Sequence, residues 1–452
     1  MKNKFKNKNV LIVGMGKSGQ SALELLNKLN AFCYIFDDKK QVLEQYSNKN
    51  SCNVLWKIDE NVVKIMDYMI ISPGVSIFSE YVKLAKLFGV KVISEVELGS
   101  YFLKGKIIGI TGSNGKTTTA SLVYAILKQA GKSCVLCGNI GDPLTANLLP
   151  YKANYVVEMS SFQLESVDKL KVDVSAITNI TQNHIDRHLN FENYKKAKYN
   201  IFKNSGRKCH LILNYDDENL KEISNQKRKF KTALISTDKE IDGYFEKNNK
   251  IFFKHGKKIK FLFDISKCKL VGKHNISNIL VATAICKELG VKEKYIEKAI
   301  NEFAPLAHRL QFVRDVNGVA YYNDSKSTSP DSTITAINSF DKKPVVLMLG
   351  GSDKNTNFDY LAKKIAKSDI KLVVVCGETA EKIVKSLKKA KFNEYAVAND
   401  FETAFHVASV NAESGDVVLL SPACASFDYF KSYEERGEKF EELVKGLENQ
   451  KV

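Results

Sequence analysis

The sequence predicts an α/β protein of three domains in series, each built on a largely parallel sheet. A chain of 452 residues is too long for one hydrophobic core. Short apolar segments alternate with amphipathic helical segments, which is typical of parallel sheets. Two of the apolar segments lead directly into glycine-rich loops. We expect a Rossmann-like domain at 1–97, a central P-loop domain at 98–306 and a second Rossmann-like domain at 307–452.

In the first domain, a basic N-terminal stretch precedes the first strand. Strands are expected at 10–13, 32–36, 67–71 and 91–93, with amphipathic helices between them. The first apolar run is too short for the central region of a signal peptide. No window of about 18 apolar residues is present, so we expect no membrane span and a cytoplasmic protein.

The central domain starts afresh with an apolar strand that leads into a helix at 117–130. Its strands are expected at 106–110, 133–136, 154–158, 174–178 and 210–213. The stretch 228–270 is rich in Lys and short apolar runs, which predicts a small antiparallel element. Helices are expected again at 275–289 and 292–302.

The last domain alternates strands and helices from about residue 318. Its strands are expected at 319–323, 344–349, 371–375 and 416–420. Ligands of parallel sheets gather at the carboxyl ends of the strands. The loops that follow the strands are therefore the places to look for functional residues.

The basic composition does not by itself indicate nucleic-acid binding. The net charge is +17, but only six of the 68 basic residues are Arg and the Lys residues are dispersed. Proteins that recognise bases use the two-pronged Arg side chain, so we expect a solvated Lys-rich surface. An Arg in such a chain can mark a place that needs the planar guanidinium, and Arg187, Arg309 and Arg436 lie in segments that carry candidate functional residues. The nine Cys form no paired metal-ligand pattern, and we expect reduced thiols.

The first motif is Gly14-x-Gly16-x-x-Gly19, between the first strand and a helix, with Asp37 at the end of the next strand. Such glycines let the backbone approach a phosphate, and the carboxylate can bind a ribose hydroxyl. A redox dinucleotide and another phosphate-bearing nucleotide both fit this spacing. The later loop, Ser72 to Gly74, is either a substrate contact or a plain turn.

The second motif, Thr111-Gly112-Ser113-Asn114-Gly115-Lys116-Thr117, joins a strand to a helix. Its backbone N–H groups can bind phosphates, Lys116 can neutralise them and the Thr117 hydroxyl can bind Mg²⁺. Ile110 stands where the usual phosphate loop has its first glycine, so a variant loop is implied. A turn that binds no phosphate is the alternative.

Possible metal ligands follow two neighbouring strands. Glu158 is a good Mg²⁺ ligand, because this ion takes one or two carboxylates together with substrate phosphates. His184 is an unusual Mg²⁺ ligand, and an ordinary loop histidine is the alternative. Lys198, in a lysine-rich helical segment, is predicted by its surroundings alone to lie on the surface.

A further group of polar residues spans the second domain boundary. Asn275 and Asn278 can face one side of a helix and bind a base, although helix capping is the alternative for one of them. Arg309 offers a fork for a phosphate, and Asp324 a carboxylate for a ribose. The loops that begin at Gly350 and Ser421 lie on the same rim if the sheet is parallel.

Taken together, these residues resemble the Mur ligase family over essentially the whole chain. The variant phosphate loop and the helix of Asn275 and Asn278 are shared across that family, which includes folylpolyglutamate synthetases. The runs 160–165 and 421–437 resemble its D-glutamate-adding members more particularly. The Asp-Asn-Pro-Arg motif of the diaminopimelate- and lysine-adding relatives does not occur in the sequence.

The resemblance implies an ATP-dependent ligase that adds D-glutamate to UDP-N-acetylmuramoyl-L-alanine through an acyl phosphate, in peptidoglycan precursor synthesis. ATP and two Mg²⁺ ions would be served by Lys116, Thr117, Glu158 and His184. Lys198 would be carbamylated and would then act as a metal ligand. The substrates are these small molecules, and we expect no nucleic-acid partner and a monomer.

The resemblance also assigns the remaining contacts. The nucleotide contacts would be Gly112, Ser113, Asn114, Gly115, Thr118, Asn275, Asn278, Arg309 and Asp324. The UDP contacts would be Gly14, Gly16, Lys17, Ser18, Asp37 and Gly74, with Asn139 on the muramoyl side. The D-glutamate contacts would be Thr328, Lys354, Ser426 and Tyr433. Position 433 departs from the common Phe, and Ser329-Pro330 departs from the expected pattern after Thr328.

Two alternatives stay open on the sequence. One is a related Mur-type or folylpolyglutamate-type ligase with another amine or acceptor. The other is a nucleotide-binding protein that is non-catalytic or redox-active.

Overall fold

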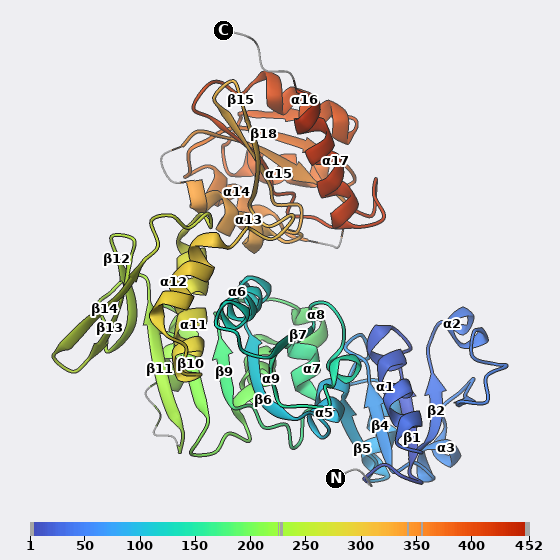
Figure 1. Cartoon of the computed structure of the whole chain (residues 1–452). Coiled ribbons are helices and arrows are strands. Elements are labelled where there is room, and N and C mark those ends of the chain that lie inside the picture. The colour runs from blue at the N-terminus through green and yellow to red at the C-terminus, as the bar shows by residue number, and fades with distance from the viewer. Residues whose placement is uncertain (1–3, 225, 227–228, 341–342, 354–355, 448–452) are drawn as a thin grey trace. The chain divides into compact units, whose positions relative to one another are not determined.

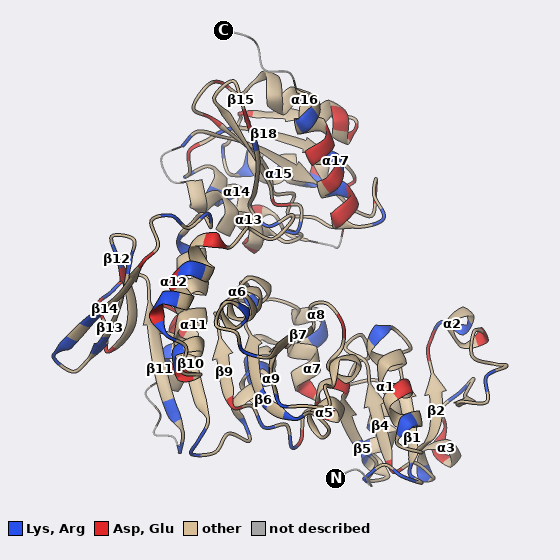
Figure 2. Ribbon diagram, viewed as in Figure 1, with Lys and Arg blue, Asp and Glu red and all other residues tan. Residues whose placement is uncertain are grey.

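The computed structural model (Figure 1) describes residues 4–224, 226, 229–340, 343–353 and 356–447 and contains three sheets. The chain forms two compact units, one of Met1–Cys268 with Ile276–Glu302 and one of Lys269–Asn275 with Phe303–Val452. The predicted α/β architecture is confirmed. Blue segments of Lys and Arg occur in every part of the ribbon (Figure 2). In the described part of the chain, no helix is long and apolar enough to cross a membrane.

The first sheet is wholly parallel, in the order β3-β2-β1-β4-β5. Its strands are β1 (Asn9–Val13), β2 (Phe32–Phe36), β3 (Asn53–Val54), β4 (Tyr68–Ile71) and β5 (Lys91–Ser94). Its helices are α1 (Lys17–Lys28), α2 (Lys40–Glu44), α3 (Glu60–Lys64), α4 (Glu80–Leu87) and α5 (Glu95–Ser100). Val10 and Ile12 of β1 pack in one core, while Leu11 and Val13 pack in another. Because successive side chains of a strand point to opposite faces, both faces of this sheet are covered.

The second sheet has nine strands in the order β14-β13-β12-β11-β10-β9-β6-β8-β7. The strands are β6 (Gly105–Thr111), β7 (Cys134–Gly138), β8 (Ala153–Glu158), β9 (Val174–Ile177), β10 (His210–Asn214), β11 (Lys231–Ser236), β12 (Gly243–Lys247), β13 (Lys250–His255) and β14 (Lys258–Asp264). The helices are α6 (Lys116–Gln129), α7 (Ser161–Glu165), α8 (Ile185–His188), α9 (Phe191–Tyr199), α10 (Glu218–Ser224), α11 (Lys273–Glu288) and α12 (Glu293–Glu302), with a 3₁₀ turn, η1, at Leu144–Asn147.

The stretch 228–270 is only partly the small antiparallel element that the sequence predicts. β11 pairs parallel with β10 and with β12, so it extends the main sheet. Only the pairings of β12 with β13 and of β13 with β14 are antiparallel, as expected. The apolar residues of this stretch therefore complete the edge of one continuous sheet.

The third sheet has the order β15-β16-β20-β17-β18-β19. Its strands are β15 (Gln311–Val316), β16 (Val319–Asn323), β17 (Val345–Gly350), β18 (Ile370–Cys376), β19 (Tyr395–Val397) and β20 (Val417–Leu420). Its helices are α13 (Pro330–Ile337), α14 (Asp359–Ile365), α15 (Ala380–Lys389), α16 (Phe401–Val410) and α17 (Tyr433–Gly446). The strands expected from the sequence do not include the two edge strands of this sheet, β15 and β19. β15 pairs antiparallel with β16. Most of its residues are partly or fully exposed, so they form no continuous apolar run.

A buried carboxylate joins the first two sheets. Glu97, on α5, accepts hydrogen bonds from the backbone N–H groups of Asp168 (2.8 Å), Lys169 (2.8 Å) and Leu170 (3.0 Å) and from the Tyr101 hydroxyl. These N–H groups belong to the segment between α7 and β9. The side chain thus satisfies donors that would otherwise be buried without partners.

Another buried carboxylate joins neighbouring strand ends in the third sheet. Asp324 follows β16 and accepts from Leu310 N (3.1 Å) and from the Ser421 hydroxyl (2.8 Å), which follows β20. Burial raises the pKa of Asp324 to about 6, although hydrogen bonds from Ser327, Ser421 and Leu310 and the charge of Arg309 oppose the shift.

We expect Glu97→Ala to lower the midpoint of thermal unfolding by roughly 5 °C or more, because three backbone N–H groups lose their acceptor. The measurement is thermal denaturation followed by circular dichroism. Glu44→Ala, at an exposed site on α2, is the matched control and should leave the midpoint unchanged. Equal midpoints for the two variants would contradict this role of Glu97.

We also expect the stability of Asp324→Asn relative to the unmodified protein to increase as the pH rises from 5 to 7.5. The pKa of Asp324 is higher in the folded state than its ordinary 3.8, so its favourable contribution is complete below about pH 4 and is lost as the pH rises through about 6. The full difference between acidic pH and pH 7.5 corresponds to about 3 kcal/mol, of which about 1.4 kcal/mol develops between pH 5 and pH 7.5. Asn keeps the shape but does not titrate. Denaturant unfolding across this pH range is the measurement, with exposed Asp315→Asn as the control, and parallel pH profiles would disprove the expectation.

Candidate active site

The loop that joins β6 to α6 excludes side chains at two positions. Gly112 has φ 151° and Gly115 has φ 78°, in the region that L side chains rarely adopt. A Cβ atom on Gly112 would lie 1.9 Å from Thr178 Oγ1, and one on Gly115 would lie 2.3 Å from Asn278 Oδ1. Backbone N–H groups in such a loop, together with the amino end of the helix, can bind phosphate groups.

The loop after β9 holds this phosphate loop in place. Asn179 accepts from Asn114 N (2.9 Å) and donates to Asn114 O (3.0 Å), and Thr178 Oγ1 donates to the same carbonyl (2.6 Å). Ser113 Oγ lies 2.9 Å from the Tyr194 hydroxyl. Ser113 and Asn114, which the sequence predicts as nucleotide contacts, therefore also fix the shape of the loop.

Two lysines donate to one carbonyl of the phosphate loop. Lys116 Nζ lies 3.0 Å from Gly112 O and 2.9 Å from Ser113 O, and Lys198 Nζ lies 2.7 Å from Gly112 O. Lys198 is 1% exposed, so the surface position that its helix alone suggests is wrong. Burial and the charge of Lys116 lower the pKa of Lys198 well below its ordinary value, against the effect of Glu158.

Glu158, at the end of β8, carries a carboxylate oxygen that lacks a protein partner. The residue is 2% exposed, and its Oε1 accepts from Asn139 Nδ2 at 2.7 Å. Its Oε2 is buried and has no hydrogen-bond partner among the residues that the structure describes. A buried carboxylate needs its lone pairs satisfied, and carboxylate and phosphate oxygens are the ligands of Mg²⁺. Glu158 therefore fits the predicted metal ligand, and Asn139 orients it.

His184 lies next to this group at the N-cap of α8. Its ring packs edge-on against Phe162, with centroids 5.0 Å apart, and its centroid lies 6.5 Å from that of Tyr194. The Tyr194 ring in turn lies 4.6 Å from Lys198 Nζ. These contacts bring His184 to the side of the site where the two lysines meet. Its left-handed backbone, with φ 53°, sets the direction in which α8 starts.

The remaining predicted nucleotide residues lie on α6 and α11. Thr117 is in the first turn of α6, and Thr118 beside it is buried. Asn278 Oδ1 accepts from the Thr119 hydroxyl (3.2 Å) and lies against Gly115. Asn275 is buried, and its Nδ2 donates to Val271 O at 2.7 Å.

The glycine motif of the first domain lines a pocket of about 600 Å³. The pocket brings together the predicted contacts Gly14, Gly16, Lys17, Ser18, Asp37 and Gly74. Ser72 Oγ donates to Gly14 O at 2.6 Å, so the loop after β4 is a wall of this pocket rather than a plain turn. The Asp37 carboxylate accepts from Met15 N (2.7 Å) and Lys39 N (2.9 Å), and it thus holds the glycine loop.

In the third sheet, the loops after β16 and β20 carry Thr328 and Ser426. The loops are hydrogen-bonded through Ala423 N and Ser327 O (3.0 Å), which places the predicted residues on neighbouring loops. Tyr433 begins α17, and its carbonyl accepts from Ser325 Oγ at 2.8 Å. The predicted contact Lys354 lies outside the described residues.

Arg309 and Asp324 are the predicted phosphate and ribose contacts of this unit. Arg309 precedes β15, and Asp324 directly follows β16. Arg309 lies between His308 and Leu310, both of which have positive φ, and its charge acts on Asp324. The Asp324 carboxylate is itself buried within protein contacts. Its assignment to a ribose stays a prediction.

Arg187 and Arg436, which the scarcity of Arg singles out in the sequence without assigning them a role, each have several polar contacts. Buried Arg436 donates to Ser325 Oγ (2.9 Å), Ala425 O (3.1 Å) and Cys424 O (3.1 Å), and thereby joins the loops after β16 and β20. Arg187 donates to Gly74 O (3.1 Å) and to Val75 O (2.5 Å). The scarcity of Arg indicates both positions, whereas their partners, which lie far away in sequence, become visible only in the structure.

Comparison with known families divides the chain into three matches. Residues 8–94 match the N-terminal domain described as Mur ligase MurD-like. Residues 110–286 match the Mur ligase middle domain. Residues 308–424 match the Mur ligase glutamate ligase domain.

Similar proteins extend these matches over nearly the whole chain. A UDP-N-acetylmuramoylalanine--D-glutamate ligase of Clostridioides difficile is 40% identical, over 98% of this chain and 99% of the relative. One of Koribacter versatilis is 39% identical, over 98% of each. Two solved structures share the fold. One is a UDP-N-acetylmuramate-alanine ligase of Thermotoga maritima, with 18% identity, coverage of 97% of this chain and 99% of the other, and a TM-score of 0.59. The other is a MurF ligase of the same organism in complex with ADP, with 17% identity, coverage of 99% of this chain and 97% of the other, and a TM-score of 0.60. The phosphate loop, the buried lysine and the orphaned carboxylate thus occur in a chain that belongs to the Mur ligase family.

Proposed function

We propose that this protein is the ATP-dependent ligase that joins D-glutamate to UDP-N-acetylmuramoyl-L-alanine, in the cytoplasmic synthesis of peptidoglycan precursors. Curated relatives with that name are 36% to 40% identical across nearly the full chain. The observation that carries the proposal is the group of Lys116, Lys198 and Glu158 around the phosphate loop. We also propose that the domains meet near residues 97 and 306, between the family matches.

The reaction has two steps. The acceptor carboxylate takes the γ-phosphoryl group of ATP, which gives an acyl phosphate and ADP. The amine of D-glutamate then attacks the acyl carbon, which forms the amide and releases phosphate. Lys116 and the amino end of α6 stabilise charge on the transferred phosphoryl group. Mg²⁺, held by Glu158 with Thr117 and His184, would neutralise phosphate charge when bound.

Lys198 is proposed to act as a carbamate. Burial and the charge of Lys116 lower the pKa of Lys198, which favours the neutral amine, and the neutral amine is the form that can attack carbon dioxide. The new bond joins Nζ to the carbon of CO₂, a proton leaves to solvent, and the lysine gains a carboxylate. The amine beside Lys116 is thereby replaced by an anion that offsets the Lys116 charge and can bind the second Mg²⁺.

We expect phosphate release only when ATP, UDP-N-acetylmuramoyl-L-alanine and D-glutamate are all present. Lys116→Ala should slow it by about 100-fold or more, because charge on the transferred phosphoryl group loses its counter-charge. Lys106→Ala, at an exposed position on β6, is the matched control. Equal release with lysine, diaminopimelate or a folate acceptor would favour another ligase of the family, and no release with any amine would disprove the proposal.

We expect Lys198→Ala to be inactive and to regain part of its activity with short carboxylic acids such as acetate or propionate. The added acid would take the place of the lost carbamate. Exposed Lys196→Ala, on the same helix, should stay fully active. Full activity of Lys198→Ala without added acid would show that no carbamate is needed.

A further inference from the structure

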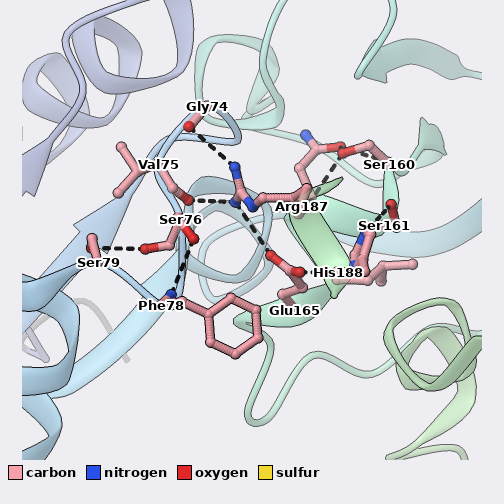
Figure 3. A network of polar contacts seen from close by, with 12 residues as sticks. Gly74, Val75, Ser76, Phe78, Ser79, Ser160, Ser161, Glu165, Arg187 and His188 are labelled. Carbon is pink, nitrogen blue, oxygen red and sulfur yellow. Dashed lines mark hydrogen bonds and ion pairs between the residues drawn. The ribbon is translucent and has the colours of Figure 1, made fainter. Parts of the chain in front are cut away.

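The wall of the first-domain pocket is held by an arginine of the middle domain. Arg187, on α8, donates from Nη1 to Gly74 O (3.1 Å) and from Nη2 to Val75 O (2.5 Å), as Figure 3 shows. Gly74 and Val75 both line the pocket. One guanidinium therefore fixes two consecutive carbonyls of the loop after β4, which a Lys ammonium could not do with the same planar geometry.

Arg187 is itself held rigidly within the middle domain. Its Nη2 lies 3.3 Å from Glu165 Oε2, and the side chains of Arg187 and Glu165 are 14% and 4% exposed. The other oxygen of Glu165 lies 2.9 Å from His188 Nδ1, and His188 Nε2 lies 3.0 Å from Ser161 Oγ. The guanidinium also lies 4.6 Å from the Phe162 ring centroid. Such a buried, charge-assisted network leaves the Arg187 side chain little freedom.

Both elements that hold this network start at the phosphate site. α8 carries His184 at its N-cap and Arg187 about one turn later. α7 is capped by Ser160, two residues after Glu158, and ends at Glu165. The pocket wall is therefore tied, through two short helices, to the residues that surround the phosphate loop.

We propose that Arg187 is a positioning residue that fixes the acceptor carboxylate relative to the phosphoryl group of ATP. The inference rests on the proposed function. An acceptor whose UDP is bound in the first-domain pocket must present its carboxylate at the phosphate loop of the middle domain. The Arg187 contact sets the distance between that pocket and the phosphate loop. The pocket has its own internal support, because Ser72 Oγ donates to Gly14 O and Asp37 holds Met15 N. Loss of Arg187 should thus leave the pocket intact but misplaced.

The test compares Arg187→Ala and Arg187→Lys with the unmodified full-length protein. Calorimetry gives the Kd of UDP and of ATP, and phosphate release gives kcat. We expect kcat to fall by about 100-fold in Arg187→Ala, because a small misplacement of reacting groups is costly. Both Kd values should stay within about twofold of the unmodified protein, and Arg187→Lys should be intermediate. A merely structural role would not separate kcat from nucleotide binding.

Controls keep the two proposals distinguishable. Arg207→Ala, at an exposed position of the same domain, should match the unmodified protein. If Arg187→Ala does not fold, Arg187→Lys and Glu165→Gln carry the test, since both keep polar groups at the site. Unchanged kcat, or a loss of UDP affinity as large as the loss of kcat, would overturn the positioning role. Absence of activity in the unmodified protein would refute the proposed function instead.

Discussion

One peptide carbonyl, that of Gly112, organises the centre of the middle domain. It accepts from both Lys116 and Lys198, so two amines meet at the phosphate loop where water is largely excluded. Burial first, and the nearby charge of Lys116 second, make a positive charge on Lys198 costly, so both lower its pKa. The loop is thus prepared for anions, whether phosphate groups or a carbamate on Lys198.

The orientation of the first two sheets depends on buried carboxylates. Glu97 accepts from three N–H groups of the middle domain, and Glu165 holds the arginine that reaches the first-domain pocket. Since a carboxylate accepts from several directions at once, each fixes more than one element. A reaction that joins groups bound in two domains requires this rigidity on the acceptor side.

The third sheet is organised in the same way by a cation. Arg436 joins the loops after β16 and β20, while Asp324 and Ser421 join the strand ends themselves. The two loops carry Ser426 and Thr328, so their spacing depends on contacts that touch neither residue. The amino-acid contacts that the resemblance assigns to these two residues would therefore depend on the loop framework as well as on the side chains themselves.

The sequence by itself determined the fold class, most strands, and the phosphate loop, because periodicity and glycine spacing are local properties. It did not reveal the edge strands β15 and β19, whose residues are too exposed to form an apolar run. The small antiparallel element was predicted, but its continuity with β11 was not, because strand pairing is not local.

Burial was the property that only the tertiary structure decided. Lys198 stands in a segment of lysines, and nothing in its neighbours distinguishes it from the exposed Lys196. Its position under Gly112 results from packing of α9 against a loop 86 residues away in sequence. The same holds for Arg187, whose partners Gly74 and Val75 belong to another domain. Local sequence fixes which groups are available, whereas contacts between distant segments decide which of them lose water and meet.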